Sequence, residues 1–341
     1  TYATFTTPIT QNKIIKWVVY SRGGCISEKF DTITLHAMPV LSIGFIPGRC
    51  VNGGISGIDS ARVTNGVTGN GWYIGNGIDS AGRLNPATAG IGVTNFKYYL
   101  STNGGCLDSI SASVRVFPKP NAQFTRPANR CLGDSTLLTN TSTISSGNIV
   151  GWNWNFGDNS TPQSLANGNA FYHTYRNFGS FVTQLTVISD SGCISDVYRD
   201  TAKIDPLPEP NFSIPPFICM PAGKAAFTNL STIANGTTSQ LTYTWNFGDG
   251  GTSTETDPTY VYSNIGPYNV RLTARSVLGC VKDTVRVLNT FYEQPRAGFT
   301  VNDSIFCQGK ETIFTDTSTA PNSTITDWFW SFGDGSVSTE R

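Results

Sequence analysis

The sequence predicts an all-β protein built from β-sandwich modules in tandem, arranged as an extended rod. Three features of the 341-residue chain support this fold class. Its 35 glycines and 18 prolines disfavour long helices. Apolar and polar residues alternate over short stretches, which is the pattern of half-buried antiparallel strands. Cysteines recur at a nearly constant spacing, which indicates an internal repeat.

The strands are predicted from this alternation. In residues 268–275, apolar side chains occupy one face and polar side chains the other. A strand upstream carries aromatic residues two positions apart, which places them in the core rather than on a sugar-binding surface. Short strands separated by Gly, Asn, Asp and Pro predict sandwiches of ~85 residues. The aromatic strand occurs three times, at Tyr243, Trp245 and Phe247, at Trp152, Trp154 and Phe156, and at Trp328, Trp330 and Phe332.

Two series of cysteines run in parallel along the chain. We expect one disulfide across each complete module, joining an early strand to a late one over ~60 residues, and contributing roughly 4 kcal/mol. Such bonds imply an oxidising compartment. One series, Cys131, Cys219 and Cys307, has a spacing of 88 residues, and the other, Cys25, Cys106, Cys193 and Cys280, has spacings of 81, 87 and 87. The expected pairs are Cys50–Cys106, Cys131–Cys193 and Cys219–Cys280, with Cys25 and Cys307 left unpaired.

Junctions that contain proline, each followed by an aromatic residue, divide the chain into five parts. Residues 1–38 are expected to be the C-terminal part of a truncated domain and residues 296–341 the N-terminal part of another. Three complete domains lie between them, at 39–118, 119–208 and 209–295. Each end fragment would expose core residues and a sheet edge. We expect further sequence of the same chain to complete each fragment; mutual completion between copies is the alternative.

A Trp-x-Phe-Gly-Asp motif marks three of these parts. Together with the downstream Asp257-Pro258 and Gly279-Cys280, the second copy resembles the polycystic kidney disease (PKD) domain nearly end to end. The first copy departs from the pattern where Asn159 replaces a glycine. The motif residues are Trp154, Phe156, Gly157 and Asp158; Trp245, Phe247, Gly248, Asp249 and Gly250; and Trp330, Phe332, Gly333, Asp334 and Gly335.

Residues 40–118 lack this motif and resemble another kind of module. Their pattern, from Trp72 to Gly105-Cys106, is similar to the Ig-like repeats that accompany PKD domains in giant secreted proteins of Bacteroidota. Tandem Ig-like and PKD modules with cysteines resemble the cell-surface adhesins and gliding adhesins exported by the type IX secretion system. The resemblance implies a structural stalk or fibre segment at the cell surface. Accessory modules of a secreted hydrolase, or a self-assembling extracellular filament subunit completed by strand complementation, are the alternatives.

The expected partners are neighbouring modules of the same chain, with other copies, surface glycans or another cell as further candidates. Composition disfavours other classes of partner. The 23 basic and 23 acidic residues form no basic cluster for nucleic acid, and no run of 18 apolar residues predicts a membrane span.

Catalysis, metals and cofactors are not expected. His36 and His173 lie near no GxSxG elbow, and no CxxC motif accompanies the cysteines. The Gly-Asp-Gly tips suggest calcium, but one carboxylate supplies little charge, so a tight turn is the expected role.

An Asp-Ser/Thr motif followed by an aliphatic residue occurs seven times. It is similar to the O-glycosylation sequon of Bacteroidota. Four copies begin the same late strand, so a repeated strand design is the competing explanation. The candidate glycosylation sites are Thr32, Ser60, Ser80, Ser109, Thr201, Thr284 and Ser304.

Overall fold

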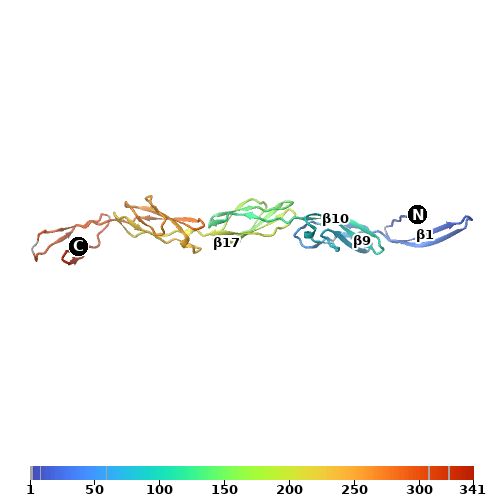
Figure 1. Cartoon of the computed structure of the whole chain (residues 1–341), viewed down its shortest axis with the longest axis horizontal. Helices are drawn as coiled ribbons and strands as arrows, with labels where there is room; N and C mark the ends of the chain where they lie inside the picture. Colours follow the sequence, from blue (N-terminus) through green and yellow to red (C-terminus); the bar gives the residue numbers. More distant parts are fainter. Residues whose placement is uncertain (1–2, 8, 59, 306–307, 322) are drawn as a thin grey trace. The chain divides into compact units, whose positions relative to one another are not determined.

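The computed structural model describes residues 3–7, 9–58, 60–305, 308–321 and 323–341. Nearly all regular structure in this part of the chain is β (Figure 1). Its helical elements are two single turns, α1 (Pro86–Ala89) and η1 (Thr238–Gln240). The predicted all-β fold class is therefore confirmed.

The chain divides into two compact units. The first contains residues 1–126, 137–171 and 182–201, and the second contains residues 127–136, 172–181 and 202–341. No helix within the described ranges is long and apolar enough to cross a membrane.

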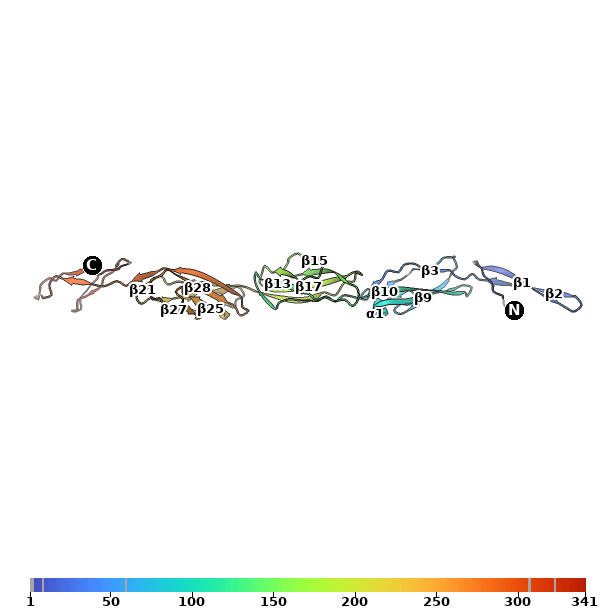
Figure 2. The same ribbon diagram turned by 90° about the horizontal axis from the view of Figure 1, so that it is seen from above.

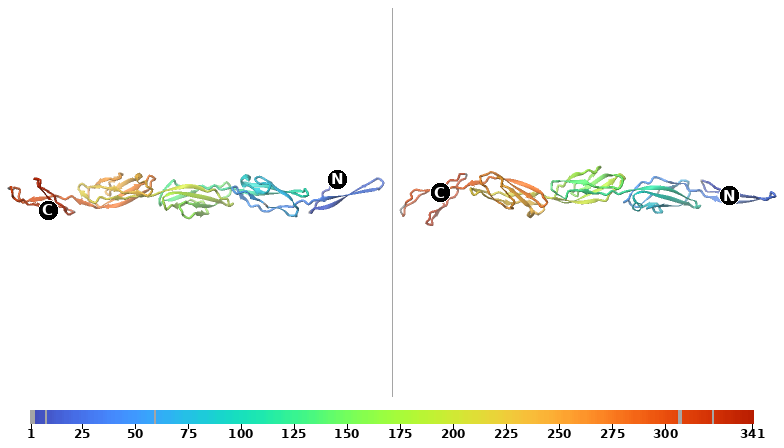
Figure 3. Two further views of the ribbon diagram at one scale, coloured as in Figure 1. Left: turned by 90° about the horizontal axis from the view of Figure 1, so that it is seen from below. Right: turned by 45° about the horizontal axis from the view of Figure 1, so that its top comes forward.

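The first unit begins with a long hairpin (Figure 3). Strand β1 (Gln11–Tyr20) pairs antiparallel with β2 (Ile26–Leu35) along the full length of both strands. The turn between them contains Gly24 at a φ of 82°. Most side chains of this hairpin are exposed, because no second layer covers it among the described residues of this unit.

A four-stranded sheet follows in the first unit. Strands β9 and β10 form a long antiparallel hairpin, β7 pairs with β9, and β4 lies parallel to the end of β10. Ile58, Tyr73, Leu84, Phe96 and Val114 are buried in its core. The strands are β3 (Leu41–Ile43), β4 (Arg49–Cys50), β5 (Ser56–Gly57), β6 (Ala61–Val63), β7 (Gly69–Gly75), β8 (Arg83–Leu84), β9 (Gly92–Thr102) and β10 (Leu107–Phe117), with the pairs β3–β6 and β5–β8 beside the sheet.

The rest of the first unit is built around the first aromatic strand, β14 (Ile149–Asn155). It pairs on one side with β15 (Gln163–Leu165) and on the other with β17 (Gly179–Ser189). β11 (Phe124–Thr125) pairs with β13 (Ser135–Asn140). The ring of Trp154 packs between Phe124 and Phe171, at centroid distances of 5.0 and 5.3 Å.

The second unit contains the second aromatic strand, β25, in a four-stranded sheet of order β26-β25-β28-β29 (Figure 2). Short pairs β20–β23 and β22–β27 accompany this sheet, and Phe212, Phe227, Trp245 and Leu272 share its core. The strands are β19 (Pro208–Glu209), β20 (Phe212–Ser213), β21 (Ile218–Met220), β22 (Lys224–Ala226), β23 (Thr228–Asn229), β24 (Thr232–Ile233), β25 (Thr242–Asn246), β26 (Thr252–Ser253), β27 (Thr259–Val261), β28 (Tyr268–Arg275), β29 (Val281–Leu288) and β30 (Phe291–Glu293).

Two parallel strand pairs in the second unit contain Cys131 and Cys219, the cysteines near the start of each PKD-like repeat, which we call the early cysteines. β12 (Asn129–Cys131) lies parallel to β18 (Tyr198–Asp205), and β21 lies parallel to β30. β16 extends from Phe171 to Thr174.

The end of the second unit consists of two small antiparallel pairs. β31 (Phe299–Val301) pairs with β32 (Phe314–Asp316), and β33 (Trp330–Ser331) pairs with β34 (Val337–Ser338). Its aromatic side chains are half-buried or exposed, in contrast to the buried aromatic strands upstream.

Candidate functional site

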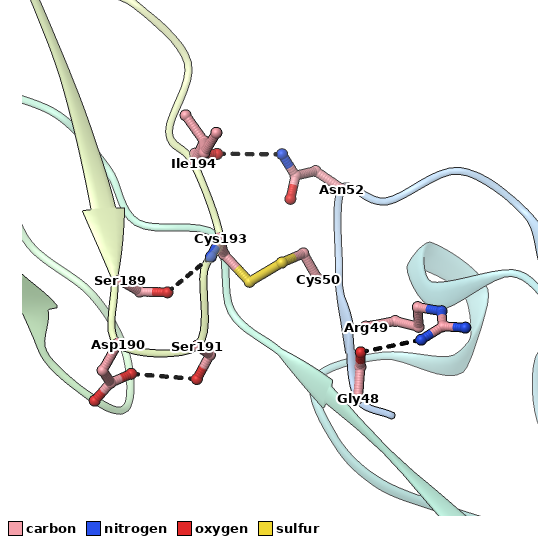
Figure 4. Close-up of a disulfide and its surroundings, with 9 residues drawn as sticks. All are labelled: Gly48, Arg49, Cys50, Asn52, Ser189, Asp190, Ser191, Cys193 and Ile194. Atoms are coloured by element: carbon pink, nitrogen blue, oxygen red, sulfur yellow. Dashed lines mark hydrogen bonds between the residues drawn. A yellow bond between two sulfur atoms is a disulfide. The ribbon is translucent and has the colours of Figure 1, made fainter. Parts of the chain in front are cut away.

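Two disulfides are the covalent features of the described chain. Cys50 is bonded to Cys193, and Cys131 is bonded to Cys280, over sequence separations of 143 and 149 residues. The Cα atoms of each pair are 5.6 Å apart. Figure 4 shows the first bond. The expected pairs Cys50–Cys106, Cys131–Cys193 and Cys219–Cys280 are therefore wrong.

The length of the last strand of each hairpin explains the error. Cys106 directly precedes β10, whereas Cys50 lies opposite Phe117 at the far end of that strand. At about 3.3 Å per residue, the 11 residues of β10 separate these two positions by roughly 35 Å. A disulfide requires Cα atoms within about 7 Å. An early cysteine is therefore too far from the turn of its own hairpin, and it bonds to the turn of the hairpin that follows in the chain.

The turns that carry the late cysteines share one hydrogen-bond pattern. The Gly192 N–H donates to the Ser189 carbonyl (2.9 Å), and the Cys193 N–H donates to the Ser189 hydroxyl (3.1 Å). Because the glycine has a φ of 79°, it allows the chain to reverse just before the cysteine. Gly279 and Cys280 make the same two bonds to Ser276, and Gly105 and Cys106 make them to Thr102.

Further polar contacts surround the first disulfide. The Asn52 amide donates to the Ile194 carbonyl across the bond (3.3 Å), as Figure 4 shows. The Asp190 carboxylate accepts the Asn148 N–H (2.9 Å) and the Ser191 hydroxyl (3.2 Å). These hydrogen bonds, above all the one from the Asn148 backbone, lower the pKa of Asp190.

Three described cysteines are free. Cys25 and Cys219 are exposed, and Cys106 is half-buried. The Cys106 thiol lies 3.6 Å from the His36 carbonyl oxygen. Cys307 lies outside the described residues.

The second Trp-x-Phe-Gly-Asp motif forms a buried strand and a tight turn. Trp245 and Phe247 are buried, and the Trp245 indole N–H donates to the Glu255 carbonyl (2.9 Å). The Asp249 carboxylate accepts the Gly251 N–H (3.0 Å) and the Tyr260 hydroxyl (3.0 Å). Asp249 thus caps the turn.

Burial affects the tyrosines beside this turn. It raises the pKa of Tyr260, with a further contribution from the Asp249 hydrogen bond. It also raises the pKa of Tyr262, whose hydroxyl donates to the Phe247 carbonyl (3.0 Å).

The other two motif copies form similar turns. Asn159 replaces the second glycine of the first copy and adopts a φ of 64°. Asn and Asp tolerate this left-handed conformation better than most residues, which explains the departure from glycine. The Asp158 and Asp334 carboxylates accept the N–H groups of Ser160 (3.0 Å) and Ser336 (2.8 Å). The hydrogen bonds from Ser336 lower the pKa of Asp334.

The described histidines and acidic residues do not form a metal-ligand cluster. No group of three or more His, Cys, Asp and Glu side chains is placed to hold a metal ion in the part of the chain that the structure describes. His36 is exposed, and the half-buried His173 packs edge-on against Tyr175 at 4.7 Å.

The candidate glycosylation residues differ in accessibility. Ser60 and Thr284 are half-buried. Thr32, Ser80, Ser109, Thr201 and Ser304 are exposed.

Two stretches of the chain match the model of one protein family. They are residues 118–204 and 208–289, and the family is the PKD domain. The chain contains two PKD domains. Each carries a buried aromatic strand, β14 or β25, followed by the capped Gly-Asp turn.

A curated protein shares a short part of this sequence. Collagenase ColA of Bacillus cereus is 54% identical over 39 residues, which are 11% of this chain and 4% of the collagenase. The chain therefore spans a small fraction of that relative's length.

Solved structures similar to the chain include single PKD domains and an adhesin. The PKD1 domain of Vibrio anguillarum Epp is 27% identical and covers 26% of this chain and 96% of its own, with a TM-score of 0.23. The PKD1 domain of the Vibrio cholerae metalloprotease PrtV is 34% identical, with coverages of 26% and 98% and a TM-score of 0.22. A Ca²⁺-stabilized, ice-binding adhesin of an Antarctic bacterium is 11% identical, with coverages of 83% and 82% and a TM-score of 0.33.

Proposed function

We propose that the chain is a tension-bearing segment of an extracellular stalk or fibre, as in surface adhesins. Tandem PKD domains and disulfides are features of a structural extracellular module. The observation that carries the proposal is the interleaving of the two bonds. Along the chain the cysteines occur in the order Cys50, Cys131, Cys193, Cys280, and the first is bonded to the third and the second to the fourth.

Because the two disulfides are interleaved, either of them alone keeps most of the chain between Cys50 and Cys280 from being extended. When the chain is pulled, the shortest covalent path from Cys50 to Cys280 crosses both bonds and runs through only the 62 residue steps between Cys131 and Cys193. If the Cys131–Cys280 bond is absent, the path crosses the Cys50–Cys193 bond and still bypasses 143 residues; if the Cys50–Cys193 bond is absent, it bypasses 149. Loss of either disulfide therefore releases a small part of the length that the two bonds together withhold.

Single-molecule force spectroscopy of the full chain tests this role. We compare the native protein with Cys50→Ser/Cys193→Ser, Cys131→Ser/Cys280→Ser and the fourfold variant. Because an extended residue spans at most about 3.6 Å, the fourfold variant should extend roughly 600 Å further than the native protein. Each double variant should exceed the native length by less than about 100 Å.

The force curves also supply the control. The unfolding events of the two PKD domains should persist in every variant, which shows that the domains still fold. Full extension after loss of one bond alone would contradict the proposed redundancy.

Several finer features belong to this proposal. The chain would comprise an Ig-like domain at 39–118, PKD domains at 119–208 and 209–295, and parts of two further domains at 1–38 and 296–341. The protein would be a non-catalytic, surface-attached glycoprotein of Bacteroidota, exported by type IX secretion. Its partners would be neighbouring modules, other copies, and surface glycans or another cell.

A second candidate role is that of accessory modules in a secreted hydrolase. The 39-residue match to a collagenase favours it. Sedimentation of the purified chain with fibrillar collagen tests this role. Co-sedimentation would support it, and its absence at micromolar concentrations would count against it.

A further inference from the structure

The solvent face of the sheet formed by β7, β9 and β10 carries an aromatic pair that the PKD domains lack. Trp72 of β7 lies opposite Tyr99 of β9, and their rings are stacked at a centroid distance of 5.6 Å. Both side chains are half-buried, so part of each ring remains accessible to solvent. In the PKD domains the same two positions, counted back from the cysteine of the hairpin turn, hold the polar pairs Asn153–Thr186 and Thr244–Thr273.

A lysine without an acidic partner lies on the same face. Lys97, two positions before Tyr99 in β9, is exposed and forms no ion pair with any described residue. Two other hairpins have a cation at this position, nine residues before the turn cysteine, and pair it with an acid three residues after that cysteine. These ion pairs are Arg271–Asp283 (3.0 Å) and Lys16–Glu28 (2.6 Å). The β9–β10 hairpin has Ser109 at the acidic position, so no carboxylate neutralises Lys97.

The described residues of this face include no acidic side chain. Asp108 of β10 lies on the other face of the sheet, opposite the buried Leu100. A second cation, Arg115, lies on the solvent face near the far end of β10 and is exposed. Next to the aromatic pair is a groove of about 570 Å³, and its lining includes Ile74, Asn95, Lys97, Ser111 and Ser113. The face is therefore positively charged and rich in hydroxyl and amide groups.

The aromatic pair also has polar groups that are free to bind a ligand. Neither the Trp72 indole N–H nor the Tyr99 hydroxyl makes a hydrogen bond to another described residue, and neither is a buried polar atom. An aromatic ring packs well against the C–H face of a sugar ring, while such polar groups bind the sugar hydroxyls. A carboxylate on the sugar would form a charge-assisted hydrogen bond with a lysine ammonium group.

We propose that this face binds an acidic polysaccharide, with a uronate ring packed on Trp72 and Tyr99 and its carboxylate paired with Lys97. An acidic glycan is chosen over a neutral one because Lys97 lacks the carboxylate partner that its equivalents have. Nucleic acid fits less well, because the second cation is about 13 Å further along the strands and few phosphates would be neutralised. The inference deepens the proposed function, since it names the class of surface glycan and the site that contacts it.

Isothermal titration calorimetry of the full chain tests the proposal. The acidic probes are hexasaccharides of galacturonate, of mannuronate and of hyaluronan, and the matched neutral probe is mannohexaose. A glycan on Ser109 would itself cover this face, so the protein is produced without glycosylation. We expect at least one acidic probe to bind at least tenfold more tightly than mannohexaose, and its affinity should decrease as the NaCl concentration increases.

Variants of Ser109 test the role of the unpaired lysine. Ser109→Asp restores the acid found at this position in the second PKD domain, so it should pair with Lys97 and weaken binding of the acidic probe about tenfold. Ser109→Asn is the uncharged control of similar size and should bind nearly as the native protein does. Lys97→Ala should weaken binding by a similar factor, whereas Lys203→Ala, on the solvent side of β18, should have no effect.

Variants of the aromatic pair test the stacking surface. Tyr99→Thr and Trp72→Thr introduce the residue found at these positions in the second PKD domain, a type that is well tolerated in strands. Each should weaken binding of the acidic probe about tenfold or more. Circular dichroism of every variant shows whether the chain remains folded.

Several results would overturn the proposal. They are the absence of binding by all three acidic probes at millimolar concentration, equal affinity for mannohexaose, and equal effects of Ser109→Asp and Ser109→Asn. Tighter binding of a six-residue oligothymidylate than of any sugar would indicate a nucleic-acid site instead. Because the force measurement depends on the disulfides, failure of the tension-bearing role would leave these binding results unchanged.

Discussion

At the scale of single residues, the Gly-Asp turn depends on two glycines for different reasons. Gly248 and Gly250 both have positive φ values, 91° and 99°. A Cβ atom on Gly248 would lie 2.9 Å from the Asn269 nitrogen and 3.0 Å from its carbonyl oxygen. A Cβ atom on Gly250 would meet no atom within 4 Å. The first glycine is therefore required by both conformation and space, and the second by conformation alone.

Gly248→Ala should destabilise the second PKD domain more than Gly250→Ala. We expect a loss of about 2–3 kcal/mol for the first variant and about 1 kcal/mol for the second, since backbone strain alone costs on the order of 1 kcal/mol. Urea unfolding of the full chain, followed by tryptophan fluorescence, measures both. Equal losses would show that the approach to Asn269 does not constrain the turn.

Asp190 should make the stability of the first PKD domain depend on pH. Its folded pKa lies below the ordinary value of 3.8 because of the hydrogen bonds from Asn148 and Ser191. A lowered folded pKa contributes stability that is present above the unfolded value and is lost as the pH falls through the folded value. Below pH 3.8, the free energy of unfolding should therefore fall less steeply with decreasing pH in Asp190→Asn than in the native protein. The control is Asp327→Asn, outside this domain, and an unchanged acid profile in Asp190→Asn would contradict the assignment.

At the scale of elements, the alternation along β25 and β28 builds the core of the second PKD domain. Trp245 is fully buried and packs against Phe212 and Phe227, at centroid distances of 5.1 and 5.6 Å. In the equivalent strand of residues 296–341, Phe329 lies one position from the core face and is 74% exposed. Whether an aromatic side chain lies on the core face or the solvent face of its strand thus decides whether it contributes to the hydrophobic core.

Trp245→Ala should therefore be severely destabilising. Removing a buried aromatic side chain costs about 3–5 kcal/mol, and the Glu255 carbonyl would also lose its hydrogen-bond donor. Phe329→Ala is the matched control, and we expect a change within about 0.5 kcal/mol. Guanidinium unfolding monitored by circular dichroism measures both effects. A small effect of Trp245→Ala would mean that the second PKD domain tolerates a large cavity.

At the scale of the whole molecule, the interleaved disulfides and the accessible sequons determine what the chain presents to its surroundings. The bonds limit how far the chain extends under tension. The seven Asp-Ser/Thr motifs are distributed along the chain, and five of them have exposed hydroxyl residues. Glycans on these positions would extend the polar surface without entering the core.

Glycan occupancy should follow exposure if the sequons are modified after folding. We expect O-linked glycan on Thr32, Ser109 and Thr201, and little on the half-buried Ser60 and Thr284. Intact-peptide mass spectrometry of protein from its native host measures occupancy at each site. Unmodified Thr32 and Thr201 would leave the repeated strand design as the explanation of the motif.

The sequence by itself determined the fold class, the aromatic strands and the PKD motif, because each depends on local patterns. Period-two alternation fixes which side chains face the core, and Gly-Asp-Gly fixes the turn. The buried Trp154 and Trp245 agree with both. These features need no information about distant parts of the chain.

Only the tertiary structure decided which cysteines meet. The nearly equal spacings of the two cysteine series are compatible with bonds within one module or between successive hairpins, because a shift by one repeat nearly preserves the spacings. The long strand β10 and the parallel placement of β4 beside its far end remove this ambiguity. They hold Cys50 away from Cys106, so that Cys50 is bonded to Cys193. Disulfide pairing is set by distances between strand ends, and those distances exist only in the folded chain.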